Sequence, residues 1–425
     1  MHARFTIGVI AGFSWFTLAF EARGAESPGP DFPTSSPGSR TALSSREITV
    51  RLPDGQNVRI GGKTGELIAE GYSSLRGRAT SSSMVPISQW AIGIHRNKPY
   101  DKAISSFTAA LQANPDRNIA FFIYSLRAGA YLGTGQLEKA LVDSGASIQL
   151  NPKYAPAYYY RGIVYSRTAK RDKAISDYTA AIELNPGYTD AYLNRGVEYS
   201  NERKYKLALR DATMAIRLNP KYADAYHNRG NYYAEIGEFD KAIADYSEAI
   251  RLHPRAMTFH GRAEAYEDAE KFDKAIADYN RVIRITPKDS YDYAVRASAY
   301  SSKGNYKQAA SDLEKAVQLS PDNASAVGSL AWLKATCPEA SLRNGKEAIR
   351  MSMRACELMK WKEPAAIFTL AAAYAETGDF EQAVKYQTQA MNMKSAYGPV
   401  RKELRERLAL YQDHKPWRSK RLSAR

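Results

Sequence analysis

Cysteine and histidine are scarce in this sequence of 425 residues, which contains two cysteines and six histidines. Two thiols exclude a disulfide framework and a four-thiolate zinc site. The histidines show no HExxH spacing, and the sequence has neither a glycine-rich phosphate loop nor a GxSxG elbow. We therefore expect no metal, no cofactor and no catalytic residue.

Long hydrophobic runs are also lacking, with one exception at the N-terminus. Phe5 to Phe20 is an apolar run of signal-peptide length, and Ala22-Arg23-Gly24 has the small-x-small pattern of a cleavage site. The sequence predicts a signal peptide over residues 1–24, a mature chain that begins near Ala25, and a periplasmic or secreted protein. The alternative is an uncleaved N-terminal anchor, the one case in which we expect contact with a membrane.

Repetition is what the chain has in abundance. Pro152, Pro186, Pro220 and Pro254 follow one another at a constant interval of 34 residues. Each interval holds two apolar stripes with helical spacing, and the proline ends the second one. Such a period predicts a solenoid of helix hairpins, because one hairpin cannot bury its apolar stripe without its neighbours.

The pattern resembles the tetratricopeptide repeat (TPR). Each copy places a small residue in its first helix, a tyrosine three residues later and an alanine in its second helix, as Gly162, Tyr165 and Ala174 do. The resemblance implies an all-α, right-handed superhelical solenoid of about nine stacked hairpins that binds proteins or peptides. Strings such as LAWLKATCP and AAAYAETGDF resemble the C-terminal module of many bacterial TPR proteins, which implies a bacterial envelope protein.

The repeats divide the chain into regions. Residues 25–45 are a Pro/Ser-rich linker, and residues 46–83 form a short region in which Ile48 to Leu52 and Asn57 to Ile60 alternate as a β-hairpin does. Two C-terminal TPR-like units cover 324–397, and a capping helix with a basic tail covers 398–425. The repeat region, 84–323, contains units near 84–117, 121–154, 155–188, 189–222, 223–255, 256–289 and 290–323.

An arginine precedes the small residue in six units, and the same six units carry an aspartate in the second helix. Units that lack the arginine also lack the aspartate, which favours a structural pair between the two helices of a hairpin. The alternative is a basic stripe that binds an anion. The pairs are Arg127–Asp143, Arg161–Asp177, Arg195–Asp211, Arg229–Asp245, Arg262–Asp278 and Arg296–Asp312.

The two cysteines, Cys337 and Cys356, lie in the C-terminal module. In an oxidising compartment they can form a disulfide. The alternative is a pair of buried free thiols.

The TPR resemblance implies a concave groove lined by the first helices. Among the residues expected to face it, acidic side chains outnumber basic ones. Asparagine, tyrosine and histidine side chains at its centre suit an extended peptide held through its backbone, because an amide both donates and accepts hydrogen bonds. We expect the contacts to come from five residues without a role in the core: Tyr160, Asn194, His227, Asn228 and Asn231.

The sequence thus favours an exported, non-enzymatic scaffold that binds a protein or peptide of unknown identity. The alternative is polyanion or nucleic-acid binding through a basic convex surface and tail, which the net charge of +15 suggests. An exported location and an acidic groove argue against that alternative.

Overall fold

The computed structural model describes residues 48–51, 57–60, 62–76, 100–393 and 398–419. The predicted signal peptide and the Pro/Ser-rich linker lie outside these ranges. Strands β1 (Ile48–Arg51) and β2 (Asn57–Ile60) form an antiparallel hairpin in which Ile48 pairs with Ile60. The hairpin therefore occurs where the alternation of residues predicts it.

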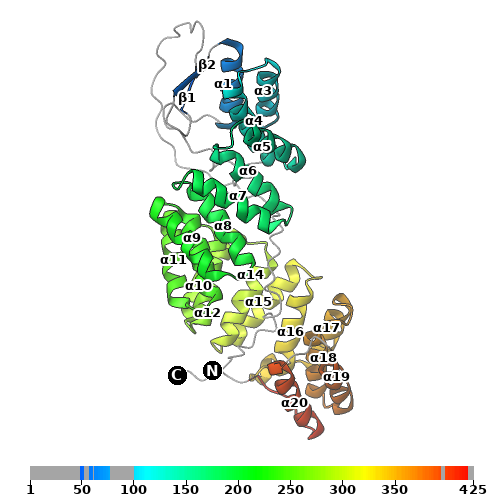
Figure 1. The fold of residues 1–425 in the computed structure, drawn as a ribbon. Helices are drawn as coiled ribbons and strands as arrows, with labels where there is room; N and C mark the ends of the chain where they lie inside the picture. Colours follow the sequence, from blue (N-terminus) through cyan, green and yellow to red (C-terminus); the bar gives the residue numbers. More distant parts are fainter. Residues whose placement is uncertain (1–47, 52–56, 61, 77–99, 394–397, 420–425) are drawn as a thin grey trace, which may run out of the picture. The chain divides into compact units, whose positions relative to one another are not determined.

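The rest of the described chain is helical and forms two compact units, which are treated separately below (Figure 1). The N-terminal unit ends at Ile236, and the C-terminal unit begins at Gly237. The N-terminal unit contains α1 (Gly62–Arg76), α3 (Tyr100–Gln112), α4 (Arg117–Gly133), α5 (Leu137–Leu150), α6 (Ala155–Arg167), α7 (Arg171–Leu184), α8 (Thr189–Asn201), α9 (Tyr205–Leu218) and α10 (Ala223–Glu235). The C-terminal unit contains α11 (Phe239–Leu252), α12 (Ala256–Asp268), α13 (Phe272–Ile285), α14 (Ser290–Ser302), α15 (Tyr306–Leu319), α16 (Ala324–Thr336), the 3-10 turn η1 (Ala340–Leu342), α17 (Gly345–Leu358), α18 (Pro364–Glu376), α19 (Phe380–Asn392) and α20 (Gly398–Gln412).

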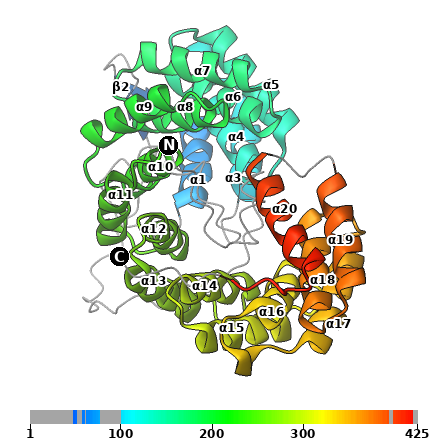
Figure 2. The same ribbon diagram turned by 90° about the horizontal axis from the view of Figure 1, so that it is seen from below.

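Within each unit, consecutive helices pair as antiparallel hairpins, and each hairpin stacks on the next. The first helices of successive hairpins touch one another and form an inner layer in each unit, while the second helices form an outer layer (Figure 2). This arrangement is the predicted all-α solenoid. Within the described ranges, no helix is both long and apolar enough to span a membrane.

Small residues set the distance between the two helices of a hairpin. A Cβ atom at Gly162 would lie 2.7 Å from the Tyr178 ring, so only glycine lets this ring pack against the first helix. Tyr178 is almost fully buried there. The repeated small residue is therefore a packing requirement.

The first hairpin departs from the predicted spacing. In the described residues α3 packs against α1. A Cβ at Gly71 of α1 would lie 2.6 Å from the Phe107 ring of α3, so this glycine makes room for a ring as Gly162 does for Tyr178. A first helix for this hairpin therefore begins at Gly62, whereas the sequence places its unit at 84–117. The intervening residues 77–99 lie outside the described ranges.

The arginine–aspartate pairs join the two helices within each hairpin. Arg195 donates to Asp211 through Nε at 2.8 Å and through Nη2 at 3.0 Å. Arg161 and Asp177 form the same bidentate pair, with both bonds at 2.8 Å. Arg229 and Asp245 lie in different units, and their relation is not described. Within one unit the other pairs are Arg127–Asp143 at 2.7 Å, Arg262–Asp278 at 2.7 Å and Arg296–Asp312 at 2.6 Å.

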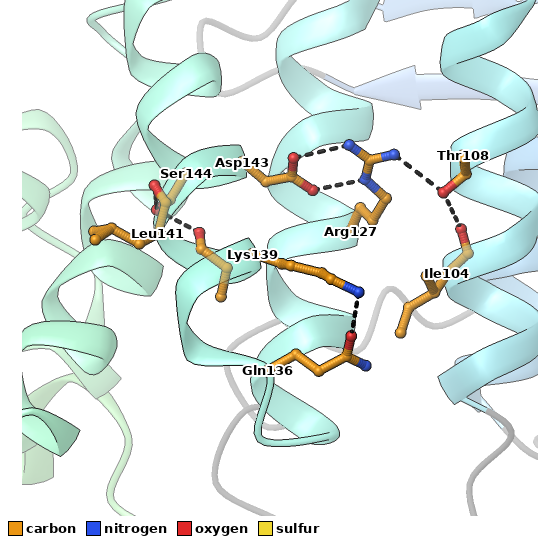
Figure 3. Close-up of polar contacts among 9 residues, drawn as sticks. Ile104, Thr108, Arg127, Gln136, Lys139, Leu141, Asp143 and Ser144 are labelled. Atoms are coloured by element: carbon orange, nitrogen blue, oxygen red, sulfur yellow. Dashed lines mark hydrogen bonds and ion pairs between the residues drawn. The ribbon is translucent and has the colours of Figure 1, made fainter.

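The same arginines also bind the preceding hairpin, which the sequence pattern did not predict. Arg127 Nη1 donates to Thr108 Oγ1 of α3 at 3.0 Å (Figure 3). The acceptor stands two residues after the aspartate position of the preceding second helix. Equivalent bonds join Arg195 to Thr179, Arg229 to Thr213, Arg262 to Ser247 and Arg296 to Asn280. Arg161 lacks the third bond, because Gly145 occupies the acceptor position.

Both cysteines are free thiols in the structure, so the predicted bridge is absent. Cys337 follows α16 and Cys356 lies in α17, and both are buried. Burial raises the pKa of the Cys356 thiol to about 12, since the thiolate would be poorly solvated. The structure therefore corresponds to the alternative of two buried free thiols.

Replacing Arg195 with leucine tests the buried pair. Because Asp211 would be left buried without its partner, we expect a loss of about 3–5 kcal/mol in the free energy of unfolding. Arg195→Leu with Asp211→Leu should recover part of that loss in a double-mutant cycle measured by urea denaturation. Arg161→Leu is the matched control and should cost less, since Arg161 has no third bond. Additive single effects would show that the pair is not coupled.

Gly145 offers a test of the bond between hairpins. A Cβ at Gly145 meets no atom within 4 Å, so a larger side chain fits there. Gly145→Thr supplies the missing acceptor for Arg161 and should be more stable than the isosteric Gly145→Val by about 1 kcal/mol. Equal free energies of unfolding for the two variants would show that the hydroxyl contributes nothing.

Candidate functional site

The inner layer of the N-terminal unit carries a row of hydrogen-bonded polar side chains. Asn194 of α8 donates to the Tyr159 hydroxyl of α6 at 3.2 Å. Ser166 of α6 donates to Glu198 of α8 at 2.5 Å. These bonds tie neighbouring first helices to each other. We call Tyr159, Ser166, Asp190, Asn194 and Glu198 the polar face.

Tyrosine rings support the polar face from behind. Tyr159 is fully buried, and its ring centroid lies 4.9 Å from that of Tyr188 and 6.0 Å from that of Tyr178. Burial raises the pKa of the Tyr178 hydroxyl, and the charge of Glu198 raises it further. Asp190 accepts a bond of 2.6 Å from the Tyr222 hydroxyl. The phenols are therefore neutral donors and acceptors at neutral pH, and they hold the carboxylates in place.

The five residues expected in the groove do not form one surface. Tyr160 is 1% exposed and packs beside Gly129, so the expectation that it is free of the core is wrong. His227 is also buried, and its Nε2 lies 3.3 Å from Asn231 Nδ2. Asn194 belongs to the polar face. Asn228 is half-buried, and its amide has no hydrogen-bond partner in the described part of the chain.

The inner layer of the C-terminal unit has a different chemistry. We call His260, Glu264, Glu267, Asp268 and Asp292 the acidic face. Glu267 accepts a bond of 2.7 Å from the Tyr279 hydroxyl, and His260 Nδ1 lies 3.6 Å from Glu264 Oε1. The Tyr291 ring, 45% exposed, stacks on His260 with a centroid distance of 5.4 Å. Among the described residues, no lysine or arginine pairs with the four carboxylates of this face.

Burial and mutual repulsion perturb these acids. Burial, followed by the charges of Glu264 and Asp268, raises the pKa of Glu267 to about 7. The pKa values of Asp268 and Asp292 are raised as well, chiefly by burial. Burial alone would lower the pKa of His260, but Glu264 and the other carboxylates raise it overall. The described residues contain no group of three or more histidine, cysteine or acidic side chains arranged to hold a metal ion.

Four tetratricopeptide repeat models match the sequence, over residues 155–188, 223–255, 263–327 and 364–397. The matches fall on hairpins of both units, and each includes first and second helices described above. The protein is a tetratricopeptide repeat protein. This result agrees with the resemblance seen in the sequence, and the solenoid is the TPR fold.

The solved structures to which the chain is similar are distant in sequence. A chain of the APC/C hetero-tetramer Cut9–Hcn1 is 19% identical with a TM-score of 0.44, and the match covers 57% of this chain and 50% of that one. A tetratricopeptide repeat protein from Parabacteroides merdae is 20% identical with a TM-score of 0.43, covering 63% and 97%. YrrB, described as a TPR protein with an unusual peptide-binding site, is 20% identical with a TM-score of 0.39, covering 43% and 95%. The TPR chain thus spans about half the length of the Cut9–Hcn1 relative, and no curated protein sequence matches it.

Two features of these TPR faces escaped the sequence reasoning. The bond between Ser166 and Glu198 was not predicted, because only the stacking of α6 on α8 brings the two side chains together. Glu264, Glu267 and Asp268 do follow a pattern in the sequence, since acids three and four residues apart share one side of a helix. Their spacing indicates an acidic stripe but not its burial.

The raised pKa of Glu267 predicts a pH dependence of stability. Between pH 4.5 and about 7 the folded protein holds a proton that the unfolded chain releases, so stability falls as the pH rises through this window. Glutamine carries no titrating proton, so Glu267→Gln should abolish up to about 3 kcal/mol of the pH-dependent fall in the free energy of unfolding between pH 5 and pH 8. Melting temperatures at pH 5 and pH 8 measure the effect, with the exposed Glu381→Gln as control. A wild-type difference that persists unchanged in Glu267→Gln would contradict the assignment.

Proposed function

We propose that this TPR protein is an exported scaffold without catalytic activity, which binds a protein or peptide partner along the first helices of its N-terminal unit. TPR proteins are typically interaction scaffolds, and neither inner face has the nucleophile, base and oxyanion donors of an enzyme site. Export is supported by the sequence of residues 1–24 alone.

The unused amide of Asn228 carries the proposal. Asn228 is half-buried and its amide bonds no other group of the described chain, so a ligand can take both sides of this amide without breaking an internal hydrogen bond. Asn228 lies in α10 next to the His227–Asn231 contact, one hairpin beyond Asn194. An extended peptide presents a carbonyl and an N–H at every residue, so its backbone can satisfy both sides of this amide.

Asn194 has fewer groups available for a ligand than the sequence suggested. One of its N–H groups is committed to Tyr159, which leaves its other N–H and part of its carbonyl capacity for a ligand. Tyr160 contributes no exposed atoms to such a contact, because it is buried. The contacts proposed here therefore come from Asn194, His227, Asn228 and Asn231, with Tyr160 as support beneath them.

The alternative, polyanion binding by the basic outer surface, finds less support. Lys139 and Lys173 lie in second helices, and each ammonium lies over a tyrosine ring of its own hairpin, 5.5 Å from the Tyr131 centroid and 5.7 Å from the Tyr165 centroid. Such cation–π contacts give these repeated lysines a structural role. Their charge remains exposed, so the alternative stays open to experiment.

Asn228→Ala should weaken partner capture from a cell-envelope extract at least several-fold, because the ligand loses its amide contacts, while the melting temperature stays unchanged. Asn194→Ala should also lower stability by about 1 kcal/mol, since it leaves the Tyr159 hydroxyl without its bond. Capture is quantified for wild type and variants by mass spectrometry at low and moderate salt.

Lys139→Ala with Lys173→Ala is the control on the outer layer. Capture that survives Asn228→Ala, is lost in the lysine variant and disappears at moderate salt would favour the polyanion alternative, because counterion release makes such binding steeply salt-dependent.

A further inference from the structure

The chain folds its own C-terminal end back onto the inner layer of the C-terminal unit. After α20, the segment Asp413–Ser419 crosses the first helices, and Figure 2 shows it in red along this layer. Arg418 pairs with Glu376 of α18 at 2.6 Å. Ser419 donates its backbone N–H to the Thr336 carbonyl of α16 at 3.0 Å, and the two hydroxyls lie 2.8 Å apart. An extended segment thus occupies the face that the first helices present.

An aromatic cage anchors the start of this segment. The guanidinium of Arg407 in α20 lies 4.6 Å from the Trp332 ring centroid, 4.7 Å from that of Phe368 and 5.2 Å from that of Trp417. Arg407 is 5% exposed. Trp332 and Phe368 belong to the successive first helices α16 and α18, so Arg407 of α20 and Trp417 of the tail complete a cage that joins two hairpins to the C-terminal helix. A desolvated cation on three aromatic rings is a strong anchor.

The tail contacts fall at one repeated position. Glu376 is the last residue of α18 and Thr336 the last residue of α16. The last residues of the two preceding first helices are Ser302 in α14 and Asp268 in α12. The last residues of the first helices thus form a row, and this row continues past Ser419, the last described residue of the tail.

Both continuing positions lack a partner. Ser302 is 6% exposed, and its hydroxyl has no hydrogen-bond partner in the described residues. Asp268 belongs to the acidic face, whose carboxylates no described lysine or arginine neutralises. A buried hydroxyl followed by an acidic patch that no described lysine or arginine neutralises is suited to an extended, basic peptide.

The sequence that follows Ser419 has this chemistry. Residues Lys420-Arg-Leu-Ser-Ala-Arg425 carry three basic side chains and no acidic one. Adjacent packed helices are spaced about 10 Å apart, and an extended chain advances about 3.3 Å per residue. At roughly three residues per helix, an extended continuation of the tail would reach α14 with Leu422 and α12 with Arg425.

We propose that the C-terminal segment is a built-in peptide ligand of the C-terminal unit, with Leu422 beside Ser302 and Arg425 beside Asp268 and Glu264. Occupied in this way, the acidic face is closed to other basic peptides until the tail is displaced. This inference concerns the C-terminal unit and does not depend on the partner site proposed for the N-terminal unit.

Carboxypeptidase B, which removes C-terminal arginine, tests the proposal on the full-length protein. Release of Arg425 should be at least tenfold slower than from a synthetic peptide of residues 413–425. Asp268→Asn with Glu264→Gln should restore the rate of the free peptide, because Arg425 loses its partners. Glu381→Gln with Asp322→Asn makes the same charge change elsewhere and should keep the protection. Release from the wild type at the rate of the free peptide would overturn the proposal.

A disulfide trap locates the middle of the segment independently of charge. Ser302→Cys with Leu422→Cys should form an intramolecular disulfide under mild oxidation, since such a bond needs Cα atoms within about 7 Å. Ser311 is exposed on the outer helix α15, and Ser311→Cys with Leu422→Cys is the control that should stay reduced. Equal oxidation of the two pairs, measured by mass spectrometry, would contradict the docked path.

Discussion

An arginine that recurs in five hairpins of the described chain, and is buried at Arg195, is the interaction on which the stack depends. Its guanidinium forms a bidentate pair with an aspartate of the same hairpin, and in most hairpins a further N–H reaches the preceding one, as Arg195 does with Asp211 and Thr179. One side chain thereby joins three helices. The ring centroids of Tyr192 and Tyr199 lie 5.6 and 5.8 Å from it, which completes its desolvated environment. A pair in this setting sets the register between hairpins, since a shifted helix would leave a buried charge unpaired.

The fold could be predicted from the sequence because the residues that fix the register between helices recur in successive copies. The small residue, the aromatic ring and the arginine–aspartate pair repeat within one chain, so each copy supports the interpretation of the others. The bond to Thr179 was not predicted, because its four counterparts are two threonines, a serine and an asparagine. These residues all accept a hydrogen bond but are not the same amino acid. The packing of α1 on α3 was not predicted for a related reason. The two helices are separated by residues 77–99, and a search for a constant interval cannot join Gly71 to Phe107.

The binding faces were harder to predict than the fold. A position on the inner side of a helix was taken to be free of the core, but Tyr160 is buried because the neighbouring Gly129 leaves space for its ring. Asn194 is committed to Tyr159 for a similar reason, since adjacent first helices are close enough for their side chains to bond. Helical periodicity identifies which side of a helix a residue occupies. Whether that side chain meets solvent or the next hairpin depends on the size of residues far away in the sequence.

The two inner faces show that one repeat can support different recognition. In the N-terminal unit the carboxylates Asp190 and Glu198 accept hydrogen bonds from Tyr222 and Ser166, so much of their charge is satisfied internally. In the C-terminal unit Glu267 also accepts a bond from a phenol, but burial and the neighbouring charges of Glu264 and Asp268 raise its pKa. A surface whose acids are satisfied recognises a neutral backbone, whereas one whose acids are not satisfied attracts cations. The repeat supplies the same helix positions in both units, and the residues at those positions determine the chemistry of the partner.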